Sequence, residues 1–467
     1  MKGAFSMGVL GAVVVPHPPL IMPEIGRGEE KKIQPTIDAY REAMRRMAAL
    51  SPDTIVLSSP HATMYADYFH ISPGNHAAGD FGNFRVPELK LEAEYDAEFV
   101  ETLSRQLAAA GVAGGTLAER APQLDHGTMV PLRYVQEFMP NVKIVRVGLS
   151  GLSPRDHYRF GECVAQAAEL LGRRVVYVAS GDLSHKLKAD GPYGFAAEGP
   201  VFDKECMAAL AAGDFLRLLS IDADLAEGAA ECGLRSFWMM AGALDRRSVK
   251  SEQLSYEGPF GVGYGVASFV AGERDAARAF GDAFMKAQKE RLAARKAAED
   301  EYVRLARMSL ETFVKTGSRA ELPKDLPSEL SAQRAGAFVS LKKDGMLRGC
   351  IGTFLPVTES LGAEILRNAV AAASEDPRFD PVREDELDAL VYSVDVLTEP
   401  EPIASDAELD PKRYGVIVES GGRRGLLLPD LAGVDTVAEQ LSIACRKGGI
   451  DPNGPVKLWR FEVVRHH

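Results

Sequence analysis

A short apolar run that ends at a histidine constrains the fold of this chain more than any other feature. The segment Val9–Ile21 reads VLGAVVVPHPPLI, and its β-branched residues stop at Pro16, directly before His17. A continuous apolar run is typical of a strand buried on both faces of a parallel sheet, and the prolines prevent it from continuing in the ladder. His17 is therefore predicted just beyond the carboxyl end of a buried strand, where open α/β sheets bind their ligands.

The same pattern recurs twice in the first half of the chain. Thr54–His61 reads TIVLSSPH, and Arg174–His185 reads RVVYVASGDLSH, so three predicted strands each lead to a histidine. One histidine after a strand is more often an ordinary loop residue, but three in one region favour a shared site. Amphipathic segments at helical spacing separate these strands, which predicts an α/β domain with a mixed or parallel sheet flanked by helices.

The pattern changes along the chain and predicts three parts. Residues 1–272 form the α/β domain, and residues 273–301 form a helical connector rich in Ala, Arg, Lys and Glu. Residues 302–467 are dense in short apolar segments and turns, which indicates an α+β domain.

Composition excludes several classes of protein. The chain has 467 residues and a formal net charge of −12 with no basic block, so nucleic acid and anionic membranes are not expected partners. No apolar stretch reaches the ~18 residues of a membrane helix, and no clear signal-peptide cleavage site is present, which predicts a cytoplasmic protein. The five cysteines are far apart without a Cys-x-x-Cys pair, which argues against a disulfide framework.

The histidines at the strand ends suggest a metal site. His17 and His61 are the best ligand pair, since imidazole suits first-row transition metals, and two histidines with one carboxylate form a site typical of Fe(II). Glu231, at the start of an apolar helical segment, is the chosen third ligand, although it could equally be a plain helix-capping acid. Its neighbour Cys232 is the alternative, and a thiolate would favour copper or zinc.

Two further histidines are candidates for proton transfer. His126 lies in LDHGTMVPL between an aspartate and a glycine, and His185 ends the third strand segment. An unperturbed imidazole pKa of about 6.5 suits a proton shuttle at neutral pH. Asp182 could orient His185, or it could cap a helix.

Four motifs in order resemble the class III extradiol ring-cleaving dioxygenases, which share their fold with the Memo family. The resemblance covers roughly residues 7–271. The motifs are PHPPL around His17, SPH ending at His61, LDHGTMVPL around His126 and SGDLSH ending at His185.

This resemblance implies a ligand set and roles for the remaining histidines. It implies iron ligation by His17, His61 and Glu231. It also implies that His185 is the acid/base and that His126 contacts the substrate or the activated oxygen.

In Memo-like relatives a cysteine takes the third ligand position, and the sequence Glu231-Cys232-Gly233 matches both patterns. The expected function is a non-haem Fe(II)-dependent dioxygenase that opens a catechol-like ring with O₂. The alternative is a metal-binding accessory protein, holding iron, copper or zinc without dioxygenase turnover. A zinc-dependent hydrolase is a weaker third interpretation.

The second domain resembles the AMMECR-type domain through LRGCIGTF at Leu347–Phe354 and EDPRF at Glu375–Phe379. Arg348, Cys350 and Arg378 could form a cleft there, or the glycines could serve a tight turn with Cys350 in the core. The fusion resembles the AmmeMemoRadiSam family, whose members are encoded beside a radical SAM enzyme. That resemblance implies a separate radical SAM partner, and a homo-oligomer is a further expectation.

Overall fold

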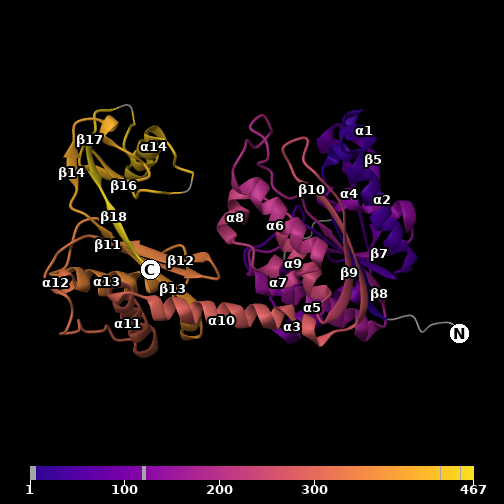
Figure 1. Ribbon diagram of the computed structural model, residues 1–467, viewed down its shortest axis with the longest axis horizontal. Coiled ribbons are helices and arrows are strands. Elements are labelled where there is room, and N and C mark those ends of the chain that lie inside the picture. The colour runs from indigo at the N-terminus through magenta and orange to yellow at the C-terminus, as the bar shows by residue number, and fades with distance from the viewer. Residues whose placement is uncertain (1–6, 118–122, 432, 453) are drawn as a thin grey trace. The chain divides into compact units, whose positions relative to one another are not determined.

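Two compact units make up the chain, Met1–Ala287 and Gln288–His467. The division falls inside one long helix, α10. The computed structural model (Figure 1) describes residues 7–117, 123–431, 433–452 and 454–467.

The first unit alternates strands with helices along most of its length. Its helices and strands are β1 (Gly8–Val15), α1 (Pro23–Gly26), α2 (Gln34–Ala49), β2 (Thr54–Ser59), β3 (Phe69–His70), β4 (His76–Phe81), β5 (Val86–Glu94), α3 (Ala97–Ala110), β6 (Gly114–Gly115), α4 (His126–Phe138), β7 (Lys143–Gly148), α5 (Pro154–Leu171), β8 (Arg174–Ser180), α6 (Glu198–Ala212), α7 (Phe215–Leu219), α8 (Ala223–Ala229), α9 (Leu234–Ala243), β9 (Arg247–Glu257), β10 (Tyr264–Arg274) and the start of α10 (Phe280–Ala298), which continues into the second unit.

A mixed sheet in the order β7-β2-β8-β1-β10-β9 forms the centre of this unit. β7, β2, β8 and β1 run parallel, and β10 and β9 are antiparallel to their neighbours. Val14 and Ser58 both pair with Ala179 of β8, so the predicted strands β1, β2 and β8 end at the same edge of the sheet. The α/β fold class is confirmed, because helices pack on this sheet as the alternating pattern predicted.

Apolar cores on the two faces of the sheet hold these helices in place. One core takes Phe99 from α3, Phe160 from α5 and Phe237 from α9. The other takes Tyr40 from α2 and Val130 from α4. Burial of such side chains contributes roughly 1.5–3 kcal/mol each, so the loops at the sheet edge stand on a rigid base.

The second unit combines antiparallel sheets with helices. Its helices and strands are α11 (Glu301–Thr316), α12 (Ser328–Ser331), β11 (Ala337–Lys343), β12 (Met346–Gly352), α13 (Leu361–Ser374), β13 (Leu390–Leu397), β14 (Glu401–Ile403), β15 (Gly415–Ser420), β16 (Arg423–Leu427), α14 (Val437–Gly448), β17 (Lys457–Phe461) and β18 (Val463–His466).

Its two four-stranded sheets have the orders β12-β11-β13-β18 and β14-β17-β15-β16. One apolar core joins α11 and α13 to the first sheet, through residues such as Leu310, Ile365 and Val339. Another joins α14 to the second sheet, through residues such as Ala444 and Val418. The α+β class is therefore confirmed for this unit.

Candidate metal centre

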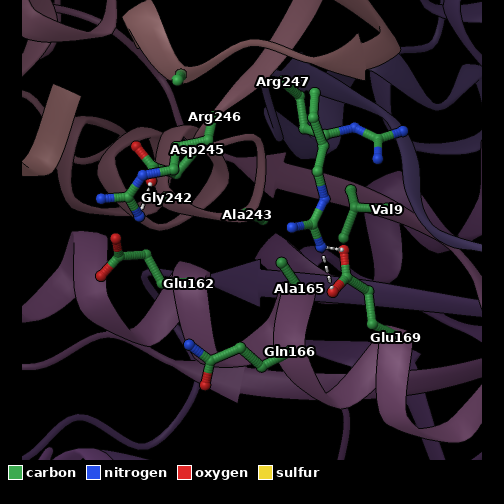
Figure 2. Close-up of a pocket in the computed structure, with 12 residues that line it drawn as sticks. Val9, Glu162, Ala165, Gln166, Glu169, Gly242, Ala243, Asp245, Arg246 and Arg247 are labelled. Atoms are coloured by element: carbon green, nitrogen blue, oxygen red, sulfur yellow. Dashed lines mark hydrogen bonds and ion pairs between the residues drawn. The ribbon is translucent and has the colours of Figure 1, made fainter. Parts of the chain in front are cut away.

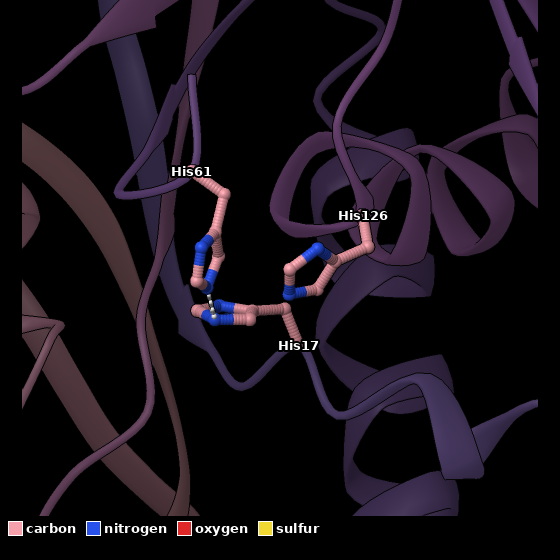
Figure 3. Close-up of side chains that lie close together, drawn as sticks. All are labelled: His17, His61 and His126. Carbon is pink, nitrogen blue, oxygen red and sulfur yellow. Dashed lines mark hydrogen bonds between the residues drawn. The ribbon is translucent and has the colours of Figure 1, made fainter. Parts of the chain in front are cut away.

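Three imidazole rings meet at the carboxyl edge of the parallel strands (Figure 3). His17 follows β1, His61 follows β2 and His126 is the first residue of α4. One potential ligand atom from each ring lies within 4.8 Å of the other two. The Nε2 atoms of His17 and His61 are 3.0 Å apart, and the ring centroids of His61 and His126 are 4.0 Å apart.

Hydrogen bonds fix the tautomer of His17. The Ser180 hydroxyl, at the end of β8, donates to the Gly127 carbonyl oxygen at 2.7 Å. Because that bond uses its one hydrogen, Ser180 Oγ must accept from His17 Nδ1, which lies 3.0 Å away. Nδ1 therefore carries the proton, and the His17 Nε2 lone pair points at His61. A histidine that binds a metal through one ring nitrogen typically donates a hydrogen bond from the other, as His17 Nδ1 does here.

Burial keeps two of the imidazoles neutral. It is the main cause that lowers the pKa of His17 to about 3, and the neighbouring His61 adds to it. Burial, with His61 and His17, also lowers the pKa of His126 to about 4. At neutral pH both rings therefore offer lone pairs rather than positive charges, which is the state that a metal cation requires.

A buried ion pair positions the two remaining imidazoles. Asp125 caps α4 by accepting from the Thr128 N–H at 2.9 Å and from the Thr128 hydroxyl at 2.7 Å. It also accepts from Ser59 Oγ at 2.6 Å and from Arg146 Nη2 at 2.8 Å. Ser59 Oγ in turn accepts from the His61 N–H at 3.2 Å. One carboxylate therefore ties the loop of His61 to the start of the helix that carries His126.

Cys232 lies next to this group of three histidines, and Asp182 forms hydrogen bonds with both Cys232 and His17. Cys232 Sγ is 3.8 Å from His17 Nε2 and accepts from the Asp182 N–H at 3.3 Å. The Asp182 carboxylate accepts from the His17 N–H at 2.8 Å. Burial, with smaller contributions from Asp182 and Glu231, raises the pKa of the Cys232 thiol. The thiol is therefore protonated in the metal-free protein and would lose its proton only on binding a metal.

Glu231, the chosen third ligand, is not part of the group that His17, His61 and His126 form among the described residues. Its Oε2 accepts from the Leu234 N–H at 2.6 Å, so the carboxylate caps α9. Burial raises the pKa of Glu231 to about 7. The capping role, one of the two alternatives from the sequence, is what the structure displays, and ligation by Glu231 stays a prediction.

His185 lies close to the group without joining it among the described residues. A positive charge on His185 would disfavour protonation of His17, and this repulsion is a minor cause of the lowered His17 pKa. His185 Nδ1 is 2.5 Å from the Ala230 carbonyl oxygen, to which it can only donate, so in the neutral ring Nε2 carries the lone pair. The ring of Tyr193 packs edge-on against it with a centroid distance of 5.1 Å. The acid/base role of His185 stays a prediction.

Sequence reasoning missed Asp125, Ser180 and Arg146 as supports of the site. The sequence did give a signal for Arg146, because this charged residue interrupts the apolar strand β7. In the structure its side chain is only 2% exposed. A charged residue at such a position needs a buried partner. For Ser180 no sequence signal was available, since its role depends on Gly127 of a distant helix.

In the second unit, the two motifs meet at the edge of a sheet. Asp376 accepts from the Cys350 N–H at 2.9 Å, and Arg378 donates to the Cys350 carbonyl oxygen at 3.3 Å. These side chains cover the outer edge of β12, which would otherwise present unpaired backbone groups. Arg348 instead pairs with Glu386 at 2.9 Å. A ligand cleft at Arg348, Cys350 and Arg378 stays a prediction.

Neither membrane spans nor disulfides appear in the described part of the chain. None of its helices combines the length and the apolar character needed to cross a membrane. The five cysteines are free, and Cys232 and Cys350 are the partly exposed ones.

Each half of the chain matches a known protein family. Residues 11–267 match the family described as the catalytic LigB subunit of aromatic ring-opening dioxygenase, and residues 303–466 match the AMMECR1 family. The first match covers more than half of the chain. The chain therefore belongs to the LigB family, in a form joined to an AMMECR1 domain, and the predicted resemblance to both is confirmed.

Individual relatives match nearly the whole of this chain or a part of it. Protein CA_C1420 of Clostridium acetobutylicum is 42% identical, over 98% of this chain and 99% of that protein. A Thermotoga maritima protein is 54% identical over 36% of this chain and 98% of its own length. Among solved structures, PH0010 of Pyrococcus horikoshii is 37% identical, covers 35% of this chain and 88% of that chain, and has a TM-score of 0.33. JW3007 of Escherichia coli K12 is 16% identical, covers 56% of this chain and 99% of that chain, and has a TM-score of 0.37.

Proposed function

We propose that the first unit is a non-haem Fe(II)-dependent dioxygenase that opens a catechol-like aromatic ring. The observation that carries this proposal is the convergence of three imidazoles, of which His17 and His126 are held neutral, on one point at the strand ends. Membership of the LigB family supports the reaction class.

The side chains present fit a divalent transition metal. His17 and His61 would hold it through Nε2, the nitrogens that now face each other at 3.0 Å. The third ligand would be Glu231 or Cys232, and His126 would contact the substrate or oxygen from its position beside His61. Bound Fe(II) would supply a site where both substrate oxygens and O₂ are held together.

His185 is the proposed general acid/base. Since its Nδ1 donates to the Ala230 carbonyl oxygen, Nε2 is free to accept a proton from a substrate hydroxyl and to return it later. The hydrogen bond to the backbone also fixes the ring orientation, as a proton-transfer group requires.

Oxygen consumption tests this function directly. Protein loaded anaerobically with Fe(II) should consume O₂ with at least one member of a panel of catechols, protocatechuates and aminophenols. His185→Ala should lower that rate by about 10² to 10⁴, while His76→Ala, at an exposed histidine on β4, should not change it. No consumption with any member of the panel would exclude the function for those substrates.

A second function follows from the position of Cys232. Its sulfur, 3.8 Å from His17 Nε2, would complete a softer site for copper or zinc. We propose in that case a metal-binding accessory protein that works with a separate radical SAM enzyme. Zinc or copper in stoichiometric amount, lost in Cys232→Ser and without O₂ consumption, would favour it. Metal binding that Cys232→Ser leaves unchanged would count against it.

A further inference from the structure

A cavity lies in the first unit at the end of the sheet opposite the histidines. It has a volume of about 430 Å³, which is within the range of small-molecule sites. Val9, at the start of β1, lines it, whereas His17 follows the end of the same strand. At the rise of a strand, eight residues separate the two places by about 25 Å. A ligand in this cavity would therefore be distinct from the metal centre.

Helices α5 and α9 form the floor of the cavity with small residues. Ala165, Gly242 and Ala243 line it, and they leave open space between the charged side chains of its rim. Gly242 brings α9 against the backbone of α5, since a Cβ there would meet the Tyr158 carbonyl oxygen at 1.9 Å. The close packing of the two helices fixes the floor.

Most charges on the rim already have partners. Asp245 accepts from the Tyr158 hydroxyl at 2.6 Å and from Arg246 at 3.1 Å. Arg274 donates to both oxygens of Glu169 at 3.0 Å. Figure 2 shows Asp245 and Arg246 on one side of the cavity and Glu169 on the other. An added anion would have to compete with these carboxylates for the arginines.

Glu162 is the exception on this rim. Its carboxylate is half-buried, and neither a hydrogen bond nor an ion pair joins it to another described residue. Burial, followed by Asp245, raises its pKa to about 7. Glu162 also lines a smaller adjoining cavity of about 220 Å³, so space surrounds it on two sides. Arg246 and Arg159 act on this carboxylate, but neither forms an ion pair with it. A half-buried carboxylate without such a partner is costly, and a ligand that brings a positive charge into contact with it reduces that cost.

We propose that this cavity binds a small organic amine, whose ammonium group pairs with Glu162. The last turn of α9 supports a cation there, because a helix carboxyl end carries partial negative charge. A carboxylate at the far end of the same molecule would meet Arg274, whose side chain is 76% exposed, in competition with Glu169. The ligand class is therefore a monoamine, a diamine or an amino acid of a few carbons.

Isothermal titration calorimetry of the full chain with four linear four-carbon probes tests whether the cavity requires a positively charged ligand. The probes are putrescine, 4-aminobutyrate, 1,4-butanediol and succinate. Putrescine, 4-aminobutyrate or both should bind, and butanediol and succinate should not. Binding of succinate alone, equal binding of butanediol, or no binding at all would overturn the proposal.

Substitutions at the cavity test whether the amine binds there. Glu162→Gln should weaken amine binding by about 10-fold or more, as loss of a charged partner does. Ala165→Met, which fills the floor, should abolish it, and Glu137→Gln, at an exposed glutamate on α4, should leave it unchanged. Thermal unfolding checks that each variant folds. Amine binding that survives both Glu162→Gln and Ala165→Met would place the amine elsewhere and overturn the proposal.

The pH dependence gives an independent readout. Asp245 and Asp282 act to raise the Glu162 pKa, and Arg246 and Arg159 act to lower it. Because Glu162 must be ionised to pair with an ammonium, amine binding should strengthen between pH 6 and pH 8. The Glu162→Gln protein should lack this dependence, and an equal dependence in both proteins would contradict the pairing.

Discussion

Replacement of Arg146 by methionine should destabilise the first unit strongly. The guanidinium is 2% exposed and lies 2.8 Å from Asp125 Oδ2. Methionine fills much of the same volume but carries no charge, so the Asp125 carboxylate would stay buried without a cation. Removal of one member of a buried ion pair typically costs about 3–5 kcal/mol of unfolding free energy. Hydrogen bonds from Ser59 and Thr128 remain, which favours the lower end of that range.

The cost should depend on pH, and the sign follows from Asp125. Burial alone would raise its pKa, but Arg146 and the hydrogen bonds hold the pKa below the ordinary value. In the wild type the carboxylate therefore adds stability above pH 4, and this contribution is lost as the pH falls through the native pKa. Without Arg146 the pKa of Asp125 should rise. The ionised carboxylate then destabilises the variant at pH 7, and this cost decreases at lower pH, where the carboxyl group is protonated. The stability difference between the two proteins should shrink from pH 7 to pH 4.

The two tryptophans allow each unit to be followed separately. Trp238 belongs to the first unit and Trp459 to the second. In a Trp459→Phe background, urea unfolding followed by fluorescence reports on the unit that contains Arg146. The double variant Arg146→Met with Asp125→Asn should recover part of the loss, because no buried charge is then left unpaired. A loss below about 1 kcal/mol, or a double variant no more stable than Arg146→Met, would refute the reasoning.

Three further outcomes are expected. Ser180→Ala removes the acceptor of His17 Nδ1 and should weaken zinc affinity, measured by chelator competition, by about 10- to 100-fold; an unchanged affinity would show that the tautomer is not fixed by this bond. Burial lowers the pKa of His157 to about 3, so the unfolded state binds its proton first and stability falls as the pH drops below about 6.5. His157→Gln should therefore reduce the slope of stability against pH by about 1.4 kcal/mol per unit between pH 4 and 6, and an unaltered slope would contradict a buried neutral ring. Asp376→Asn removes a charged acceptor at Cys350 and should cost the second unit about 1–3 kcal/mol in urea unfolding followed through Trp459; no change would show that the edge of β12 does not depend on it.

The sequence was sufficient to predict the strands that carry the site. β1, β2 and β8 are inner strands of the sheet and are buried at almost every position, so their apolar runs are long and continuous. β9 was missed because it is the outermost strand of that sheet, and polar residues such as Lys250 and Glu252 interrupt its pattern. Strands buried on one face or at an edge give weaker sequence signals than central ones.

Prediction of the site was less complete, because the remaining partners depend on tertiary packing. His126 begins a helix, and its place beside His61 depends on Asp125 and Arg146, which are far from each other in sequence. Glu231 and Cys232 are adjacent, so a motif alone does not distinguish them. The structure separates them, since one carboxylate oxygen caps α9 while the sulfur lies near His17.

Metal stoichiometry tests the central claim of a metal centre at His17 and His61 most directly. The measurement is the metal content of the purified, dialysed full chain and of single alanine variants, by elemental analysis after incubation with Fe(II) under anaerobic conditions. The wild type, His76→Ala and His185→Ala should each retain about one metal ion per chain, as expected for one mononuclear site, while His17→Ala and His61→Ala should retain almost none. Metal content equal to that of the wild type in the His17→Ala or His61→Ala protein, or loss of metal in His185→Ala, would contradict the account.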